Sequence, residues 1–192
     1  AGELFGFLGP NGAGKSTTIR VLIGTQKPTS GRVEVAGFSL PKDFAKVKPL
    51  FGYVPDAENH VEEFTGRENL NLFAKLYGVP FSEVEQALGR LELSEAADLP
   101  VRTYSRGMRK KLLIAREILH RPSILYLDEP TANLDRHSTD VVRKLLRELS
   151  YKKFLKGGHI ESFPITWVRI SGIPLGTGMP PTRDHMNKIV EQ

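Results

Sequence analysis

A glycine-rich segment near the start of the chain limits its possible folds more than any other feature. Residues 9–16 read Gly-Pro-Asn-Gly-Ala-Gly-Lys-Ser and fit the spacing G-x-x-x-x-G-K-[ST]. The preceding residues 4–8 form a short apolar run typical of a buried strand, and residues 15–23 have the apolar spacing of a helix. Strand, glycine loop and helix in this order predict a phosphate-binding loop within an α/β fold.

The chemistry of phosphate binding explains the residue types in this loop. Glycines allow successive backbone N–H groups to turn toward a phosphate, and the following helix presents its positive end to the same anion. We expect Lys15 to supply a positive charge to the β- and γ-phosphates and Ser16 to supply a hydroxyl to Mg²⁺. A chance glycine turn is the alternative, and the strand–loop–helix context disfavours it. The predicted nucleotide-binding residues are Gly9, Pro10, Asn11, Gly12, Ala13, Gly14, Lys15, Ser16 and Thr17.

Two adjacent acids end a second apolar strand. Residues 124–129 read Ile-Leu-Tyr-Leu-Asp-Glu, and a parallel sheet places the carboxyl ends of its strands at the ligand-binding edge. This predicts Asp128 as a Mg²⁺ ligand and Glu129 as the general base for an attacking water, with Lys15 as the other catalytic residue. The alternative is an acidic strand end before the turn at Pro130. Lys15 makes that alternative less favourable, because a phosphate loop needs such a strand beside it.

The remaining pattern predicts a helical insertion in the α/β core. Helices are expected at residues 67–77, 82–91, 107–119 and 138–149, and strands at 32–36, 52–54 and 165–170. The helix at 107–119 is expected to bury one apolar stripe. The predicted fold is an α/β P-loop NTPase core, residues 1–149, with an inserted helical subdomain over about 60–118. Residues 150–192 read as an atypical C-terminal tail, and their Gly- and Pro-rich texture favours the hypothesis that unrelated sequence follows Ser150.

Composition narrows the classes of partner. The absence of cysteine excludes disulfides and thiolate metal sites and fits a reducing compartment. Without an apolar run of roughly 18 residues, any membrane role is that of a peripheral subunit. Residues 150–192 contribute +3 of the net charge of +5, so the rest of the chain is nearly balanced. We therefore expect no nucleic-acid partner.

Taken together, the motifs resemble those of ABC transporter ATP-binding subunits. Residues 9–17 resemble the Walker A loop, 104–108 (Tyr-Ser-Arg-Gly-Met) the signature, 125–130 Walker B and 132–135 the D-loop. They occur in the order found in this family and cover roughly residues 1–149. Residues 68–77 and the signature are most similar to exporter-type subunits that handle drugs, lipids or ions.

The resemblance implies a function. It implies binding and hydrolysis of ATP with Mg²⁺ to power transport, which makes the chain an ATPase. It also implies membrane-spanning transporter subunits as partners, contacted near residues 56–65, and a cytoplasmic location at the inner face of the cell membrane. A second ATP-binding subunit would complete a homo- or heterodimer, in which the signature closes on the other subunit's nucleotide. The residues assigned to this trans-acting signature are Ser105, Arg106, Gly107 and Met108.

Elementary physics agrees with the dimer. Ser105 and the Gly107 N–H precede a helix and form a second anion-binding terminus. This half-site and the phosphate loop cannot both face one nucleotide within a chain, and a two-fold dimer pairs the unlike halves twice. A plain helix cap at Ser105 is the alternative.

The chain departs from the family pattern in several places. Asp56 stands where the family usually has glutamine, so the resemblance places it near a Mg²⁺-bound water as part of the metal site, with a surface turn as the alternative. Arg106 replaces a signature glycine and either neutralises the γ-phosphate or lies in solvent. The family's adenine-stacking aromatic lies in N-terminal strands that would precede residue 1, so we expect this chain to lack both.

The histidines give one more departure. His159 lies 30 residues after Glu129, the spacing of the family's switch histidine, but the residues before it are not apolar. A loop histidine is the alternative. Surface positions are expected for the other four, which are His60, His120, His137 and His185.

Two other functions remain open. One is a soluble ABC-type ATPase that is not linked to transport. The other is a module that binds nucleotide but is deficient in hydrolysis, as the altered loop at Asp56 and the atypical tail suggest.

Overall fold

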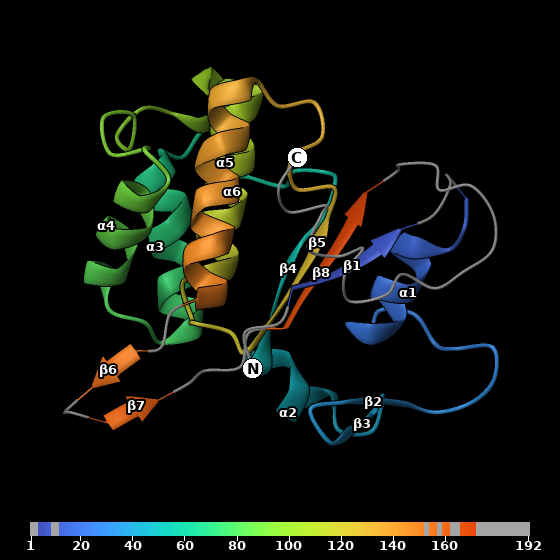
Figure 1. Ribbon diagram of the computed structural model, residues 1–192. Helices are drawn as coiled ribbons and strands as arrows, with labels where there is room; N and C mark the ends of the chain where they lie inside the picture. Colours follow the sequence, from blue (N-terminus) through green and yellow to red (C-terminus); the bar gives the residue numbers. More distant parts are fainter. Residues whose placement is uncertain (1–3, 9–11, 152–153, 157–158, 162–165, 172–192) are drawn as a thin grey trace.

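A four-stranded parallel sheet forms the centre of the protein. The computed structural model describes residues 4–8, 12–151, 154–156, 159–161 and 166–171, and describes side chains over residues 12–149. The strand order is β1-β8-β5-β4. Figure 1 shows helices on both sides of this sheet, so the predicted α/β class is confirmed. The strands are β1 (Leu4–Leu8), β4 (Phe51–Val54), β5 (Ile124–Asp128) and β8 (Thr166–Ser171).

Strand β5 shows why the sheet needs cover on both faces. Its side chains alternate, so Leu125 and Leu127 are buried in the large cluster formed with the helices between residues 66 and 151. Tyr126 points to the other face and packs against Ile19 and Ile23 of the α1 segment. Helix α1 (Lys15–Leu22) therefore covers one face and the helical cluster covers the other.

The helices on the larger side begin and end where the sequence favours it. At the start of α3, Thr65 accepts a hydrogen bond from the Glu68 N–H while Glu68 accepts from the Thr65 N–H, which forms a capping box. All four predicted helices of this side are confirmed. They are α3 (Gly66–Tyr77), α4 (Phe81–Arg90), α5 (Arg106–Ile118) and α6 (Arg136–Tyr151).

Helix α5 differs from its prediction. It contacts β4, α3, α4 and α6, and is therefore surrounded by protein along most of its length. Buried residues follow one another without a break from position 110 to 119. The predicted stripe of Met108, Leu112, Ala115 and Leu119 lies in the core, but burial extends well beyond it, because a helix enclosed by four elements has little surface left for its polar residues. Its buried charged residues are Lys110, Lys111, Arg116 and Glu117.

Smaller elements flank this core. A separate apolar cluster contains Val35 of β2 (Val33–Val35), Leu40 of β3 (Phe38–Leu40) and Val47 of α2 (Phe44–Val47). Only β2 among these elements was expected from the sequence. None of the helices in the described ranges is both long and apolar enough to span a bilayer. The flanking elements are β2 (Val33–Val35), β3 (Phe38–Leu40), α2 (Phe44–Val47), β6 (Phe154–Lys156), β7 (His159–Glu161) and two 3₁₀ turns, η1 (Lys48–Leu50) and η2 (Val101–Thr103).

The predicted strand at residues 165–170 is confirmed as β8, and it occupies a central place. It pairs in parallel with β1 on one side and with β5 on the other. The core sheet thus extends past the expected boundary after residue 149, which counts against unrelated sequence after Ser150. The boundary itself and the limits of the helical subdomain remain predictions. His159 lies on β7, but its side chain is outside the described residues, so its role as the switch histidine remains a prediction. His185 lies wholly outside the described residues.

Candidate functional site

The ends of β1 and β5 lie at one edge of the sheet. Phe7 of β1 and Asp128 of β5 both align with Ile170 of the strand between them. Two strand spacings separate the backbones of Phe7 and Asp128, about 10 Å. The carboxyl end of β1 and the acids that end β5 are therefore close neighbours, as expected for a site at the carboxyl edge of a parallel sheet.

The start of α1 has the backbone of an anion-binding turn. Gly12 and Gly14 have φ of 82° and 84°, a conformation that favours glycine. Gly14 is the N-cap residue, and α1 has neither a side-chain cap nor an acidic residue in its first turn. In contrast, Thr65 caps α3 and Ser105 caps α5. The start of α1 therefore lacks the side-chain cap seen on α3 and α5, as is typical of a helix end that binds an anion.

Lys15 sits in the first turn of α1 and is only 7% exposed. A chance surface turn would leave a lysine ammonium in water, because burying it without compensation is unfavourable. Asp128 at the end of β5 is equally buried. Ser16 is half-buried, while Ala13 and Thr17 are exposed. Gly9, Pro10 and Asn11 lie outside the described residues.

Glu129 follows Asp128 in a strained conformation. Its φ is 46°, which is uncommon for a residue with a side chain. Asn133, four residues on, also has a positive φ of 57°. Such strain concentrates at functional sites, where the surrounding structure holds it. The positive φ of Glu129 turns the chain immediately after β5, and the residue is half-buried rather than fully solvated.

The loop after β4 brings Asp56 to the same region. Lys110 interacts electrostatically with both Asp56 and Asp128, and Tyr53 does the same. Burial lowers the pKa of Lys110, while these carboxylates oppose that shift. Burial raises the pKa of Tyr53, with the Asp128 charge adding to the effect. Asp56 itself is exposed. The charges of Asp56 and Asp128 therefore both act on one buried lysine.

The signature residues begin α5. Ser105 is its N-cap, and its Oγ accepts a hydrogen bond of 3.2 Å from the Met108 N–H. Ser105 therefore caps the helix, as the alternative interpretation expected. This cap does not exclude a ligand at Ser105, because a capping hydroxyl can still donate its own proton. Arg106 is exposed, and its charge acts on nearby Glu58.

Within one chain, the signature touches the D-loop. A Cβ atom on Gly107 would overlap Ser138 Oγ and lie 3.0 Å from Asp135 Oδ2. Asp135 in turn accepts a hydrogen bond of 2.8 Å from the Ser138 N–H at the start of α6. The hydrogen bonds from Ser138 lower the pKa of Asp135.

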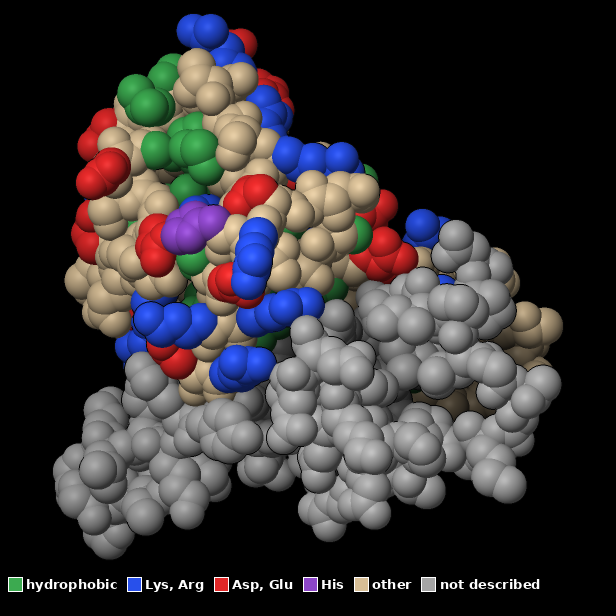
Figure 2. All heavy atoms as spheres, turned by 45° about the horizontal axis from the view of Figure 1, so that its top comes forward, with side chains coloured by type: hydrophobic (Ala, Val, Ile, Leu, Met, Phe, Trp, Pro, Cys, Tyr) green, Lys and Arg blue, Asp and Glu red, His purple; other side chains and the backbone are tan. Residues whose placement is uncertain are grey.

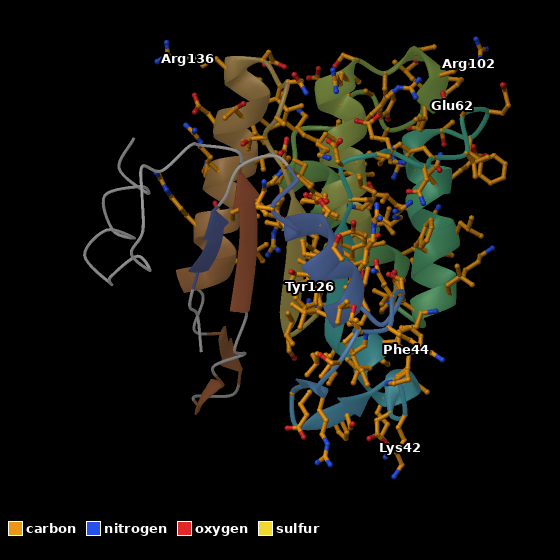
Figure 3. The ribbon with its side chains drawn as sticks, turned by 90° about the vertical axis from the view of Figure 1, so that its right-hand side faces the viewer. Lys42, Phe44, Glu62, Arg102, Tyr126 and Arg136 are labelled. Atoms are coloured by element: carbon orange, nitrogen blue, oxygen red, sulfur yellow. The ribbon has the colours of Figure 1, made fainter. Side chains whose placement is uncertain are left out.

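The starts of α5 and α6 lie at one end of the molecule. Figure 3 shows Arg102, which precedes α5, and Arg136, which begins α6, at the end opposite Lys42.

The surface expectation is wrong for two histidines. His60 is half-buried, with Nε2 3.0 Å from the Arg109 carbonyl oxygen. His120 is half-buried too, with Nε2 3.1 Å from the Phe51 carbonyl oxygen and its ring 4.3 Å from that of Tyr77. Local pattern could not place these rings, since their partners are distant in sequence. His137 is exposed as expected and pairs with Glu92 at 2.8 Å.

Sequence reasoning also missed the buried charges of α5. Lys110, Arg116 and Glu117 all contact the loop or strand beside the site. Residues 109–111 read Arg-Lys-Lys, a run that usually marks a solvated helix face. No signal in the local pattern distinguishes a buried lysine from an exposed one here.

The donor set suits Mg²⁺ held mainly by a nucleotide. No cluster of three or more His, Asp or Glu side chains that could hold a metal by itself occurs in the part of the chain that the structure describes. Mg²⁺ usually takes one or two carboxylates and completes its shell with phosphates and water. Ser16 and Asp128 fit that need, with Asp56 nearby.

On the described part of the face drawn in Figure 2, acidic and basic side chains are intermixed.

The family follows from a direct match. The ABC transporter family matches residues 1–132 of the chain. This chain belongs to the ABC transporter family. The match spans the phosphate loop, the signature and the acids that end β5. Recognition of the family from its motifs is confirmed.

Individual relatives agree with this membership. The chain is 39% identical over 152 residues to the Nod factor export ATP-binding protein I of Ralstonia nicotianae, covering 77% of this chain and 47% of the relative. A solved ATP-binding subunit of an ABC transporter has a TM-score of 0.72 at 28% identity, covering 88% of this chain and 68% of that one. CbiO1 of Clostridium perfringens, part of the transporter complex cbiONQ, has a TM-score of 0.72 at 27% identity, covering 90% and 68%. The chain spans about half the length of the curated relatives it matches.

Proposed function

We propose that this ABC transporter family chain binds ATP and hydrolyses it to power transport through separate membrane subunits. One observation carries the proposal. The start of α1, which follows Gly14 and has no side-chain cap, carries the buried Lys15. It lies at the same sheet edge as Asp128 and the strained Glu129. Phosphate binding and hydrolysis need these two groups together.

Each residue has a role in this proposal. The N–H groups at the start of α1 bind the phosphates, and Lys15 neutralises their charge. Glu129 accepts a proton from the water that attacks the γ-phosphorus as the bond to the β-phosphate oxygen breaks. Mg²⁺, held by Ser16 and Asp128 with Asp56 beside them, would withdraw charge from the β- and γ-phosphates.

The wider assembly is part of the same proposal. Ser105, Arg106, Gly107 and Met108 begin α5 beside the D-loop, where a second ATP-binding subunit could supply the nucleotide that they bind. The nearby Asp56–Thr65 region would contact the membrane subunits, at the inner face of the cell membrane. The exporter type is supported by the relative named for Nod factor export.

A hydrolysis-deficient binding module is the second candidate. It is favoured by Asp56, whose negative charge stands where the family usually has an amide. Asp can still accept a hydrogen bond from a Mg²⁺-bound water, so this candidate is weaker than the ATPase. A soluble ATPase not linked to transport has no observation in its favour.

Turnover of the purified chain tests the proposal. We expect the wild type to release phosphate from Mg·ATP, and Lys15→Ala to lose both nucleotide binding and turnover. Lys27→Ala is the matched control, because Lys27 is exposed and lies beyond α1. Equal turnover by wild type and Lys15→Ala would contradict the proposal. Binding without turnover in the wild type would favour the second candidate.

A further inference from the structure

Lys110 is a buried lysine in α5, the helix that begins at the signature residues. Its side chain is on α5, five residues after the capping Ser105, and the residue is only 3% exposed. A buried ammonium group is unfavourable unless hydrogen bonds and opposite charges compensate it. Its contacts therefore show what the protein gains from placing a charge there.

Both contacts go to one short piece of backbone. The Lys110 Nζ donates hydrogen bonds of 2.8 Å to the Pro55 carbonyl oxygen and 3.1 Å to the Asp56 carbonyl oxygen. The two carbonyls belong to the peptide groups on either side of the Asp56 Cα, so Lys110 fixes the direction of both peptides and the position of that Cα. The negative charges of Asp56, Glu58 and Asp128 act on the Lys110 ammonium and partly offset the cost of its burial.

The same helix holds the rest of this loop. Arg116 donates hydrogen bonds of 3.1 Å to the Asn59 carbonyl oxygen and 2.9 Å to Asn59 Oδ1. His60 is 3.0 Å from the Arg109 carbonyl oxygen. The segment at residues 55–60 is thus attached to α5 at three places, and Lys110 provides the attachment closest to Asp56.

We propose that Lys110 is a positioning residue for ATP hydrolysis, which holds the Pro55–Asp56 backbone so that the Asp56 carboxylate faces the nucleotide site beside Asp128. The inference rests on the proposed ATPase function. It has a mechanical consequence: any displacement of α5, whose first turn carries Ser105 and Gly107, moves Asp56 with it. The site within one chain thereby responds to what binds at the start of its own α5.

A purely structural role is the competing explanation, and two variants distinguish it. Lys110→Met removes both hydrogen bonds while keeping an unbranched apolar stem. Lys111→Met is the matched control, since Lys111 is comparably buried at 5% on the same helix and has no hydrogen bond to residues 55–60 among the described side chains. Lys110→Arg restores a donor, and it serves as the second variant if Lys110→Met does not fold.

Two measurements follow from the proposal. We expect Lys110→Met to lower kcat about tenfold to a hundredfold with little change in KM for Mg·ATP, because misplacement near the reaction costs rate. We expect Lys110→Arg to recover most of kcat and Lys111→Met to resemble the wild type. In the absence of nucleotide, hydrogen–deuterium exchange at residues 56–61 should accelerate in Lys110→Met but not in Lys111→Met.

A double-mutant cycle completes the test. If Lys110 acts through Asp56, Lys110→Met should lower kcat less than about twofold in an Asp56→Ala background. Full additivity of the two substitutions, or unchanged exchange at residues 56–61, would overturn the inference while wild-type turnover stands. A wild type that does not hydrolyse ATP would instead overturn the proposed function on which the inference rests.

Discussion

Gly107 of α5 and Asp135 of the D-loop pack so closely that a Cβ atom on Gly107 would lie 3.0 Å from Asp135 Oδ2 and overlap Ser138. We therefore predict that Gly107→Ala forces α5 and α6 apart at their first turns. The free energy of unfolding should fall by about 1–3 kcal/mol, as for other overpacked sites. Urea denaturation of the two proteins measures this difference.

Gly89 provides the control for this substitution. It lies near the end of α4, is exposed, and a Cβ atom there would meet only Ser94 Oγ at 3.8 Å. Gly89→Ala should raise the free energy of unfolding by about 0.5–1 kcal/mol, because alanine favours the helix. A Gly107→Ala variant as stable as Gly89→Ala would contradict the close packing of α5 on the D-loop.

The pair of Arg116 and Glu117 should contribute strongly to stability. Their side chains are 2.8 Å apart and nearly buried, and the Arg116 guanidinium lies 4.5 Å from the Phe73 ring centroid. Glu117 also accepts a hydrogen bond of 3.1 Å from the Tyr53 N–H. We predict that Arg116→Met lowers the free energy of unfolding by about 3–5 kcal/mol, because the Glu117 carboxylate stays buried without its partner.

An exposed ion pair serves as the comparison that shows how much burial adds to the stabilisation. Arg121 and Glu83 are 2.7 Å apart, with the Arg121 side chain 62% exposed. Arg121→Met should change the free energy of unfolding by less than about 1 kcal/mol. Thermal or chemical denaturation of both variants makes the comparison. Similar losses for Arg116→Met and Arg121→Met would show that the α5 ion pair is not the stabilising element described.

Stability should fall as the solution becomes mildly acidic. Burial lowers the pKa of both His60 and His120, and His120 Nδ1 is buried without a hydrogen-bond partner among the described residues. Below about pH 6.5 the unfolded chain therefore binds protons that the folded chain does not yet accept, and the free energy of unfolding decreases. The loss continues until the pH reaches the lowered folded pKa values.

Substitution isolates the histidines from other titrating groups. The double variant His60→Gln and His120→Gln should show a smaller drop in the free energy of unfolding between about pH 7.5 and pH 5.5 than the wild type. Equilibrium denaturation at the two pH values measures both drops. An identical drop in the two proteins would remove these histidines from the explanation.

The sequence predicted correctly those helices and strands that are determined by residues adjacent in sequence. Helix α3 lies in a local run rich in Glu and Leu, and α1 follows the glycine loop, so both were found from sequence. The strand at β8 was also found, because a short apolar run is a local signal.

Other features depend on contacts between distant residues. Pairing between β1, β8 and β5 is not local, so the central position of β8 could not be read from a tail rich in Gly and Pro. Burial of Lys110 depends on α5 being enclosed by four elements, whereas a basic run alone indicates a solvated face. Motifs that carry their own chemistry pointed to Lys15 and Asp128, which the structure buries, whereas no local motif pointed to the contacts of α5 beside them.

ATP-dependent dimerisation of Glu129→Gln tests the central claim most directly. The claim is that one chain holds half of a hydrolysis site, with Glu129 as its base and a second subunit completing it. Glu129→Gln keeps the shape of the side chain but cannot accept the proton from water. With Mg·ATP, light scattering should show a stable dimer of Glu129→Gln with no phosphate release, while the wild type turns over and returns to monomer. A variant that hydrolyses ATP at the wild-type rate, or that stays monomeric with bound ATP, would contradict the claim.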